Sequence, residues 1–243
     1  VKPSTVYSLN NCRKIEKEIS ALNKLGIYGR FVSSVPLPFE IAGGVEIKGQ
    51  AQFHPLKFLY EISRQLEIYE NTKVIELKNN KAIAENGTIS YKKVIVATHF
   101  PFINKFGGYF LKMYQHRSYV IALEKAQDVK GMYIDEDEKG LSFRNYNEML
   151  LLGGGSHRTG KSGGNWKELK QFSQQYYPDK KILSQWATQD CMSLDQVAYI
   201  GQYSKKTPDL FVATGFNKWG MTNSMVSAMI LTDLVQGKHN DYT

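Results

Sequence analysis

The most informative segment of the sequence is Asp209-Leu-Phe-Val-Ala-Thr-Gly215-Phe-Asn-Lys-Trp-Gly220-Met-Thr, which runs directly into Asn223-Ser-Met-Val-Ser-Ala-Met-Ile-Leu-Thr-Asp-Leu-Val. The short apolar run predicts a strand, the glycine-bearing segment a turn, and the run after it a helix. The amide donors in the first turn of that helix have no partners within the helix and point back at the turn. The junction therefore suits a ligand that carries phosphate or carbonyl oxygens.

Composition limits the classes of protein to consider. The 243 residues are 42% hydrophobic, enough for one large domain or two small ones. The net charge of +8 would allow attraction to nucleic acid. The basic residues are scattered, however, the acidic run Asp135 to Glu138 interrupts them, and no recognition motif accompanies them. We predict a solvated surface and no nucleic-acid partner.

Cysteine and histidine usage indicates neither a disulfide framework nor a metal site. Cys12 and Cys191 are too few for such a framework, and the five histidines form no metal-type pair. We predict reduced thiols, a cytoplasmic location and no metal. No apolar run is long enough to span a bilayer and no signal pattern is present, so we predict no membrane span. Because the chain starts at Val1 and not at methionine, we expect a piece of a longer protein.

Helices and strands alternate along the chain. Asn10 or Asn11 caps a predicted amphipathic helix that Gly26 ends, and Pro55 lies in the first turn of a second helix, with His54 as a cap or packing residue. Short strands are predicted at 73–78, 81–85 and 88–91, then an apolar strand at 93–98 that should be buried on both faces. Alternating strands at 114–123, 131–134, 141–146 and 148–152 predict an antiparallel sheet.

A nucleotide-binding motif competes with this interpretation. Gly155-Ser-His-Arg-Thr-Gly160-Lys161-Ser162 matches the phosphate-cradling P-loop. A P-loop requires a helix that begins at the Lys-Ser pair, whereas here Gly163-Gly164-Asn165 follow and helical periodicity starts at Trp166. A P-loop nucleotide hydrolase is one alternative function, and a surface loop is the simpler reading of the same residues.

Three segments share a family resemblance: the Gly215 turn with its helix, the helix–meander–strand block that ends in Ala97-Thr98, and the run from Trp186 through Asp195 to Tyr199-Ile-Gly201. Together they resemble the FAD-dependent oxidoreductases of the D-amino-acid oxidase and glycine oxidase family, over about residues 5–240. The resemblance implies an α/β (α+β) fold: the FAD-binding portion of a glutathione-reductase-like fold plus an antiparallel-sheet substrate domain.

The resemblance also implies a domain plan. Residues 1–50 would lead into the substrate domain, 51–108 form the middle of the FAD domain, 109–190 form the substrate sheet, and 191–243 return to the FAD domain. The G-x-G-x-x-G turn of the family's first βαβ unit is missing, so we expect this piece alone to hold FAD weakly or not at all. Exposed strand edges would favour self-association. Some members of the similar subset carry a Rieske domain after the flavoprotein.

The residues that the resemblance places near FAD lie toward its adenine half or near its flavin: Val74, Ala97, Thr98, Gly215, Phe216, Trp219, Gly220, Met221 and Thr222. The substrate-facing candidates are Tyr119, Arg144, Gln189 and Asp190. In that family the chemistry is hydride transfer from an amine or amino acid to the flavin. A non-catalytic binding module on the same scaffold is the third alternative.

One departure from the family bears on the substrate. The family often has an arginine four residues after the tryptophan, where its planar fork can bind a substrate carboxylate, but this chain has Asp190. A carboxylate cannot anchor a carboxylate. We therefore hypothesise that Asp190 holds the ammonium of an amine or polyamine-type substrate. The alternative is a structural aspartate bonded to nearby backbone.

Overall fold

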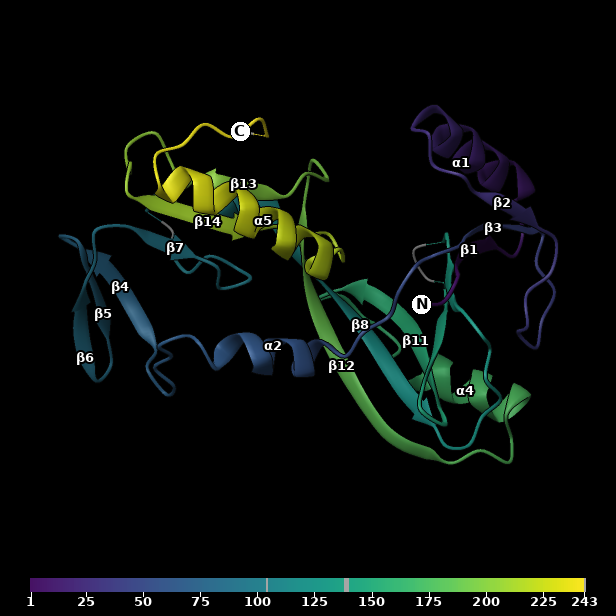
Figure 1. The fold of residues 1–243 in the computed structure, drawn as a ribbon. Helices are drawn as coiled ribbons and strands as arrows, with labels where there is room; N and C mark the ends of the chain where they lie inside the picture. Colours follow the sequence, from purple (N-terminus) through teal and green to yellow (C-terminus); the bar gives the residue numbers. More distant parts are fainter. Residues whose placement is uncertain (104, 138–139, 243) are drawn as a thin grey trace. The chain divides into compact units, whose positions relative to one another are not determined.

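The computed structural model describes residues 1–103, 105–137 and 140–242 (Figure 1). Glu138, the end of the predicted acidic run, lies outside these residues. The chain folds as two compact units. The first unit comprises residues 1–61 and 117–188, and the second unit comprises residues 62–116 and 189–243.

The strands are β1 (Ser4–Ser8), β2 (Arg30–Val32), β3 (Gly43–Ile47), β4 (Val74–Lys78), β5 (Lys81–Ala84), β6 (Gly87–Ser90), β7 (Val94–Val96), β8 (Met113–Leu123), β9 (Met132–Asp135), β10 (Ser142–Tyr146), β11 (Met149–Arg158), β12 (Ile182–Ser193), β13 (Tyr199–Gln202) and β14 (Leu210–Thr214). The helices are α1 (Cys12–Lys24), α2 (Pro55–Ser63), α3 (Tyr109–Lys112), α4 (Lys167–Tyr176) and α5 (Gly220–Val235).

The first unit is built on a mixed sheet with the strand order β12-β8-β11-β10-β9-β1-β3-β2. β10 pairs antiparallel with β9 and β11, as the alternating sequence predicts, whereas β1 pairs parallel with β9. The predicted antiparallel pairing of the strands at 131–134, 141–146 and 148–152 is confirmed. The sheet as a whole is mixed because β1, which the sequence pattern did not reveal, joins it from the N-terminal lead-in through a parallel pairing.

The core of the first unit lies where α4 packs against β11. Alternate residues of the strands point into it, and Phe143, Leu150, Leu152 and Leu169 are each at most 1% exposed. The intervening residues of β10 and those at the start of β11 lie on the opposite face and are half-buried. The two faces of this part of the sheet therefore differ in how closely they are packed.

Helix α1 packs on β1, β2 and β3 through Ile15, which is 1% exposed. The predicted cap is confirmed, since the side chain of Asn11 accepts a hydrogen bond from the Lys14 amide, and Gly26 follows the helix end with φ of +70°.

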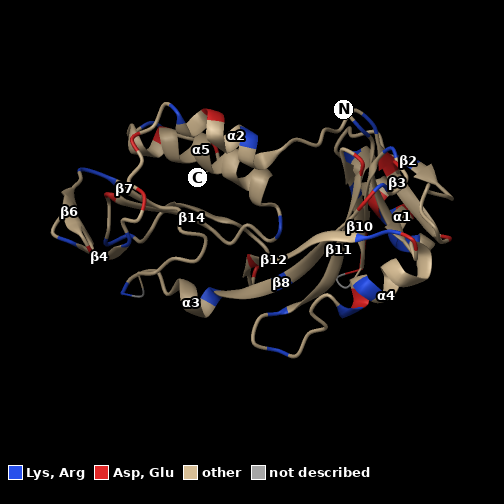
Figure 2. Ribbon diagram, turned by 90° about the horizontal axis from the view of Figure 1, so that it is seen from below, with Lys and Arg blue, Asp and Glu red and all other residues tan. Residues whose placement is uncertain are grey.

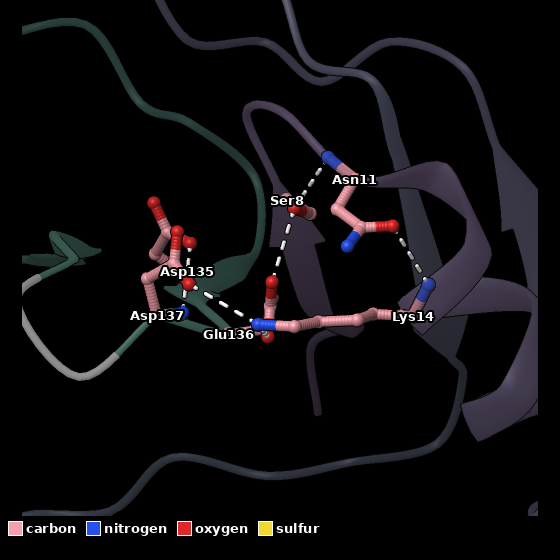
Figure 3. A network of polar contacts seen from close by, with 6 residues as sticks. All are labelled: Ser8, Asn11, Lys14, Asp135, Glu136 and Asp137. Carbon is pink, nitrogen blue, oxygen red and sulfur yellow. Dashed lines mark hydrogen bonds and ion pairs between the residues drawn. The ribbon is translucent and has the colours of Figure 1, made fainter.

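A polar network joins the start of α1 to the end of β9 (Figure 3). Lys14 Nζ lies 2.8 Å from a Glu136 carboxylate oxygen and 3.3 Å from one of Asp137, and the Ser8 hydroxyl donates to Glu136. Asp135 beside them is 7% exposed, and burial raises the pKa of its carboxyl. The network fixes α1 to the sheet, and the buried Asp135 carboxyl lies beside it.

The second unit contains a three-stranded sheet of order β13-β14-β7 that carries α5. β14 is buried at every position, and Phe211 and Ala213 pack against Leu231 of α5. The prediction that the 93–98 strand is buried on both faces is wrong, because Ile95 is 44% exposed. β7 is the last strand of its sheet in the described structure, so it lacks the second neighbour that central strands have.

A separate meander, β4-β5-β6, also belongs to the second unit. Asn79 and Asn80 have φ of 50° and 55°, which confirms the predicted hairpin turn.

Helix α2 has no buried residue within the described structure. His54 Nδ1 accepts a hydrogen bond from the Lys57 amide, which confirms that it caps this helix. The apolar side chains of Leu56, Leu59 and Tyr60 are 71%, 52% and 65% exposed. None of the described helices combines the length and the apolar composition that a membrane span needs.

Candidate functional site

The glycine turn after β14 has a left-handed backbone, and the Asn217 side chain bonds it to a neighbouring strand. Gly215, Asn217 and Lys218 have φ of 70°, 50° and 68°. Asn217 Oδ1 accepts from the Ser193 amide at 2.9 Å, and Asn217 Nδ2 donates to Ser193 Oγ at 2.8 Å and to the Gly215 carbonyl at 2.9 Å. Asn217 thus fastens the turn to the end of β12.

Gly215 is required by its backbone conformation and not by lack of space. A Cβ there would lie 3.4 Å from Ser193 Cβ and 3.5 Å from Met113 Sδ, which are ordinary contacts. Thr214, just before the turn, donates its hydroxyl proton to the His99 carbonyl. This bond holds the loop after β7 beside the glycine turn.

A hollow of about 480 Å³ lies between the glycine turn, the first half of α5 and the loop after β7. Five of the predicted cofactor residues line it, namely Ala97, Gly215, Phe216, Gly220 and Met221. Its volume is within the range of roughly 300–1,000 Å³ usual for small-molecule sites. The structure therefore brings together the predicted residues from two distant parts of the sequence.

The other four predicted cofactor residues do not line the hollow. Val74 is in β4 of the meander, and the Thr98 hydroxyl donates to the Phe100 carbonyl. Trp219 is 70% exposed at the N-cap of α5, and Thr222 is exposed in the first turn of that helix.

Seven lining residues were not predicted from the sequence: His99, Ala213, Thr214, Ser224, Ser227, Ala228 and Leu231. Ser224, Ser227 and Ala228 follow Gly220 at intervals of four, seven and eight residues, so they share one face of α5. This run of small residues at helical spacing was the signal that could have revealed the face.

Ser227 is distinct among the hydroxyl residues of α5. Ser224 and Thr232 donate to the carbonyls four residues earlier, each at 2.6 Å. Ser227 is 4% exposed, and its hydroxyl has no hydrogen-bond partner among the described residues. A buried polar group without a partner costs about 1–3 kcal/mol. The hollow thus presents an unused donor and acceptor.

The N-terminus of α5 adds further donors. The Trp219 side chain makes no capping bond within the described structure. The amides of Gly220, Met221 and Thr222, in the first turn, have no acceptors within the helix. With the positive end of the helix dipole, they favour a ligand oxygen that carries negative charge.

Tyr119 lies in the core of the first unit. It is 3% exposed, and its hydroxyl lies 3.0 Å from His157 Nε2 and donates to Asn165 Oδ1 at 3.3 Å. This position gives Tyr119 a packing role, since its ring faces the α4 side of the sheet.

The remaining substrate candidates have different surroundings. Arg144, in the first unit, is half-buried and lines a hollow of about 230 Å³. In the second unit, exposed Gln189 donates to Gln115 Oε1. Asp190 is half-buried, and its carboxylate makes no hydrogen bond or ion pair with a described residue. The backbone bond expected of a structural aspartate is therefore not found there.

The P-loop interpretation is wrong. Gly155 to Arg158 continue strand β11, and α4 begins only at Lys167, five residues after Ser162. In the described structure no helix starts at Lys161 to aim its dipole at a phosphate. Gly163 packs on the His157 ring instead, since a Cβ there would lie 2.1 Å from it.

Charged residues and potential metal ligands are dispersed among the described residues. Lys and Arg are scattered over both units (Figure 2). In the part of the chain that the structure describes, no three His, Cys, Asp or Glu side chains could hold a metal ion.

Comparison with known proteins identifies the family. Residues 4–234 match the family model described as "FAD dependent oxidoreductase". Glycine oxidase from Geobacillus kaustophilus superposes with a TM-score of 0.84 at 17% identity, over 99% of this chain and 72% of that one. L-proline dehydrogenase from P. horikoshii gives 0.78 at 17%, over 98% and 73%.

A curated relative is also similar in sequence. The "Putative Rieske 2Fe-2S iron-sulfur protein YhfW" of Bacillus subtilis (strain 168) is 34% identical over 250 residues. The match covers 96% of this chain and 49% of the relative, so the chain spans about half of that protein's length. With the family model covering nearly the whole chain and the glycine-oxidase fold reproduced, this chain belongs to the FAD-dependent oxidoreductase family of D-amino-acid oxidase and glycine oxidase.

Proposed function

We propose that this chain is part of an enzyme that oxidises an amine or amino acid by hydride transfer from the carbon bearing the amine to FAD. FAD is the cofactor that family membership implies. The observation that carries the proposal is the hollow beside Gly215, where predicted cofactor residues meet an unpartnered buried hydroxyl and uncapped helix amides.

The residues of the hollow fit FAD. The small side chains of Ala97, Gly215 and Gly220 leave room for a planar group, and the first-turn amides of α5 offer donors to its carbonyl or phosphate oxygens. Phe216 and Met221 supply apolar contact. Trp219, Thr222, Thr98 and Val74 remain proposed outer contacts. When bound, FAD supplies the hydride acceptor.

The chain itself would bind and orient the substrate. Asp190 has a carboxylate with no partner in the described structure, so we propose that it accepts hydrogen bonds from the substrate ammonium. Gln189 next to it would help to fix that group. Arg144, also without an ion partner, is proposed to bind a negative group of the substrate.

The wider organisation is also proposed. We assign residues 1–50 and 109–190 to a substrate domain and 51–108 and 191–243 to an FAD domain. The name of the B. subtilis relative supports a Rieske domain as a partner in the natural protein. Two free cysteines support a reducing compartment, the cytoplasm. Exposed apolar residues on α2 support self-association of this piece alone.

The test uses the natural protein that contains this chain. We expect a bound-flavin absorption spectrum and anaerobic bleaching of that spectrum by an amine or amino acid. Bound flavin that no amine reduces would support the binding-module alternative, and absence of flavin would refute the proposal.

Two variants then locate the ammonium site. Asp190→Asn should raise KM for the amine substrate, while Asp209→Asn, a matched loss of a half-buried aspartate at the start of β14, should not. Equal kinetics for both variants would remove Asp190 from the site.

A further inference from the structure

The segment from Arg158 to Asn165 contains the second half of the P-loop-like motif and returns to the sheet that it leaves. It starts at the end of β11, and Trp166 fixes its far end, since the indole nitrogen donates to the Val120 carbonyl of β8 at 3.2 Å. Asn165 has φ of 50°, and its carbonyl oxygen would lie 3.0 Å from a Cβ at Gly155. Residues 158–165 therefore form a loop that is closed against the sheet of the first unit.

This loop packs on His157, the residue just before it. A Cβ at Gly163 would lie 2.1 Å from the Cδ2 atom of the imidazole, so the loop backbone lies directly on the ring. The Tyr119 ring is stacked with the same imidazole, with 5.8 Å between the ring centroids. His157 is half-buried, so protons can still exchange between its ring and water.

Three hydrogen bonds connect His157 to its surroundings and to the loop. The Tyr119 hydroxyl oxygen lies 3.0 Å from His157 Nε2, and this hydroxyl donates to Asn165 Oδ1 at 3.3 Å. His157 Nδ1 lies 3.0 Å from the Arg158 carbonyl oxygen, which can only accept, so Nδ1 carries a proton. The single hydroxyl proton of Tyr119 goes to Asn165, so Nε2 must carry a proton as well. All three bonds form together only when the imidazole is doubly protonated.

A neutral imidazole loses one of the three bonds, because it has one donor nitrogen and one acceptor nitrogen. With the proton on Nδ1, Nε2 takes the Tyr119 proton and Asn165 loses its donor. With the proton on Nε2, the bond to the Arg158 carbonyl is lost. The closed loop thus holds one proton more than the open loop, so closure is favoured as the pH falls and is lost as the pH rises. Histidine side chains change charge between about pH 5 and pH 8.

Charged side chains on the surrounding elements act on the same equilibrium. Arg117 of β8, Arg158 of β11, Lys161 of the loop and Lys167 of α4 oppose a further positive charge, whereas Glu168 of α4 favours it. All five are exposed, so water and salt screen their effect. The hydrogen bonds of a charged imidazole are stronger than those of a neutral one. The bonds therefore decide the direction of the pH dependence.

We propose that His157 is a proton-operated latch, which holds the loop of residues 158–165 closed when the imidazole is charged and releases the loop when the imidazole is neutral. The inference is independent of the oxidation proposed above. It gives the P-loop-like residues a conformational role in place of phosphate binding. Opening of the loop uncovers the Tyr119 hydroxyl and the start of α4.

The test is hydrogen exchange of peptides that cover residues 158–165, in the natural protein that contains this chain, at about pH 5 and about pH 8. Each rate is divided by the intrinsic exchange rate at the same pH. We expect the loop to exchange about tenfold more slowly at the lower pH, as for the gain of one hydrogen bond. Peptides of α4 are the internal reference and should show no such change. Equal protection at both pH values, or stronger protection at the higher one, would overturn the proposal.

Variants of the latch residues assign the effect. His157→Gln and Tyr119→Phe nearly keep the size of each side chain and should make the protection of the loop independent of pH. His239→Gln is the matched control, since His239 has an exposed side chain in the second unit, and it should behave as the wild type does. If His157→Gln retains the pH dependence of the wild type, another group causes it and His157 is not the latch.

Two changes in the loop separate the latch from simple packing. Asn165→Asp keeps the acceptor and lacks the amide donor, so the protection at low pH should persist. Its loss would mean that the Asn165 amide nitrogen faces Tyr119 and that the closed loop needs no charged imidazole. Gly163→Ala places a methyl group where the His157 ring lies, so the loop should exchange rapidly at both pH values. Protection of this variant equal to that of the wild type would show that the loop does not close over His157.

Discussion

Replacing Asn217 by alanine should release the glycine turn. The side chain makes three hydrogen bonds, to the Ser193 amide, the Ser193 hydroxyl and the Gly215 carbonyl. At about 1 kcal/mol each, their loss costs roughly 3 kcal/mol. Alanine at φ of 50° adds about 1 kcal/mol of backbone strain. We expect the free energy of unfolding of the second unit to fall by roughly 3–4 kcal/mol.

The assay is urea unfolding combined with hydrogen exchange of peptides that cover Ser193 and Gly215, because two units need not unfold together. Asn217→Gly should recover about 1 kcal/mol by removing the strain, and Asn217→Asp should be intermediate because it keeps the acceptor. Asn223→Ala is the control: it loses one bond, to the Phe216 carbonyl, and about 1 kcal/mol. If Asn217→Ala lowers the free energy of unfolding by no more than Asn223→Ala does, the three Asn217 hydrogen bonds do not stabilise the turn.

Three further changes test other parts of the structure. Ser227→Ala should raise the melting temperature of the FAD-free protein, since it removes an unpaired buried hydroxyl, and should weaken FAD binding in a flavin titration; a lower melting temperature would show that Ser227 has a partner. Burial raises the pKa of Asp135 above the value of about 4 that it has in the unfolded chain. The folded state therefore binds the proton more tightly, and this carboxyl lowers the free energy of unfolding as the pH rises above about 4. Asp135→Asn should therefore have a higher melting temperature than the wild type at pH 7. The difference between the two melting temperatures should be smaller at pH 4. Gly215→Ala should cost about 1–2 kcal/mol through strain alone, measured by urea unfolding, because its Cβ meets no close contact.

Local features of the fold were predictable from sequence, and long-range ones were not. The Asn11 cap and the turn at Gly215 follow from residue types that act on neighbouring backbone, so the pattern revealed them. The alternation around Tyr119 showed that it is on one face of a strand, but only the packing of α4 decides which face is the core. Strand β1 is five residues long and is defined by its pairing with β3 and β9.

In the candidate site, too, the residues that belong to short motifs were predictable and those that depend on distant neighbours were not. The glycine turn and Ala97 were found through short motifs, and the structure brings them to one hollow. The importance of Ser227 depends on its missing partner, and that of Arg144 on a missing counter-ion, within the described structure. Neither absence can be read from a linear pattern, because each is a property of the surrounding space.

The formation of helix α2 depends on contact with another surface. A nine-residue helix is below the length of about 12–15 residues at which isolated helices become marginally stable, and none of its described side chains is buried. Leu56, Leu59 and Tyr60 give it an apolar surface that water does not stabilise. Its helicity should therefore appear when another surface covers these side chains. The exchange rates of the α2 amides would thus report assembly of this protein independently of any catalytic readout.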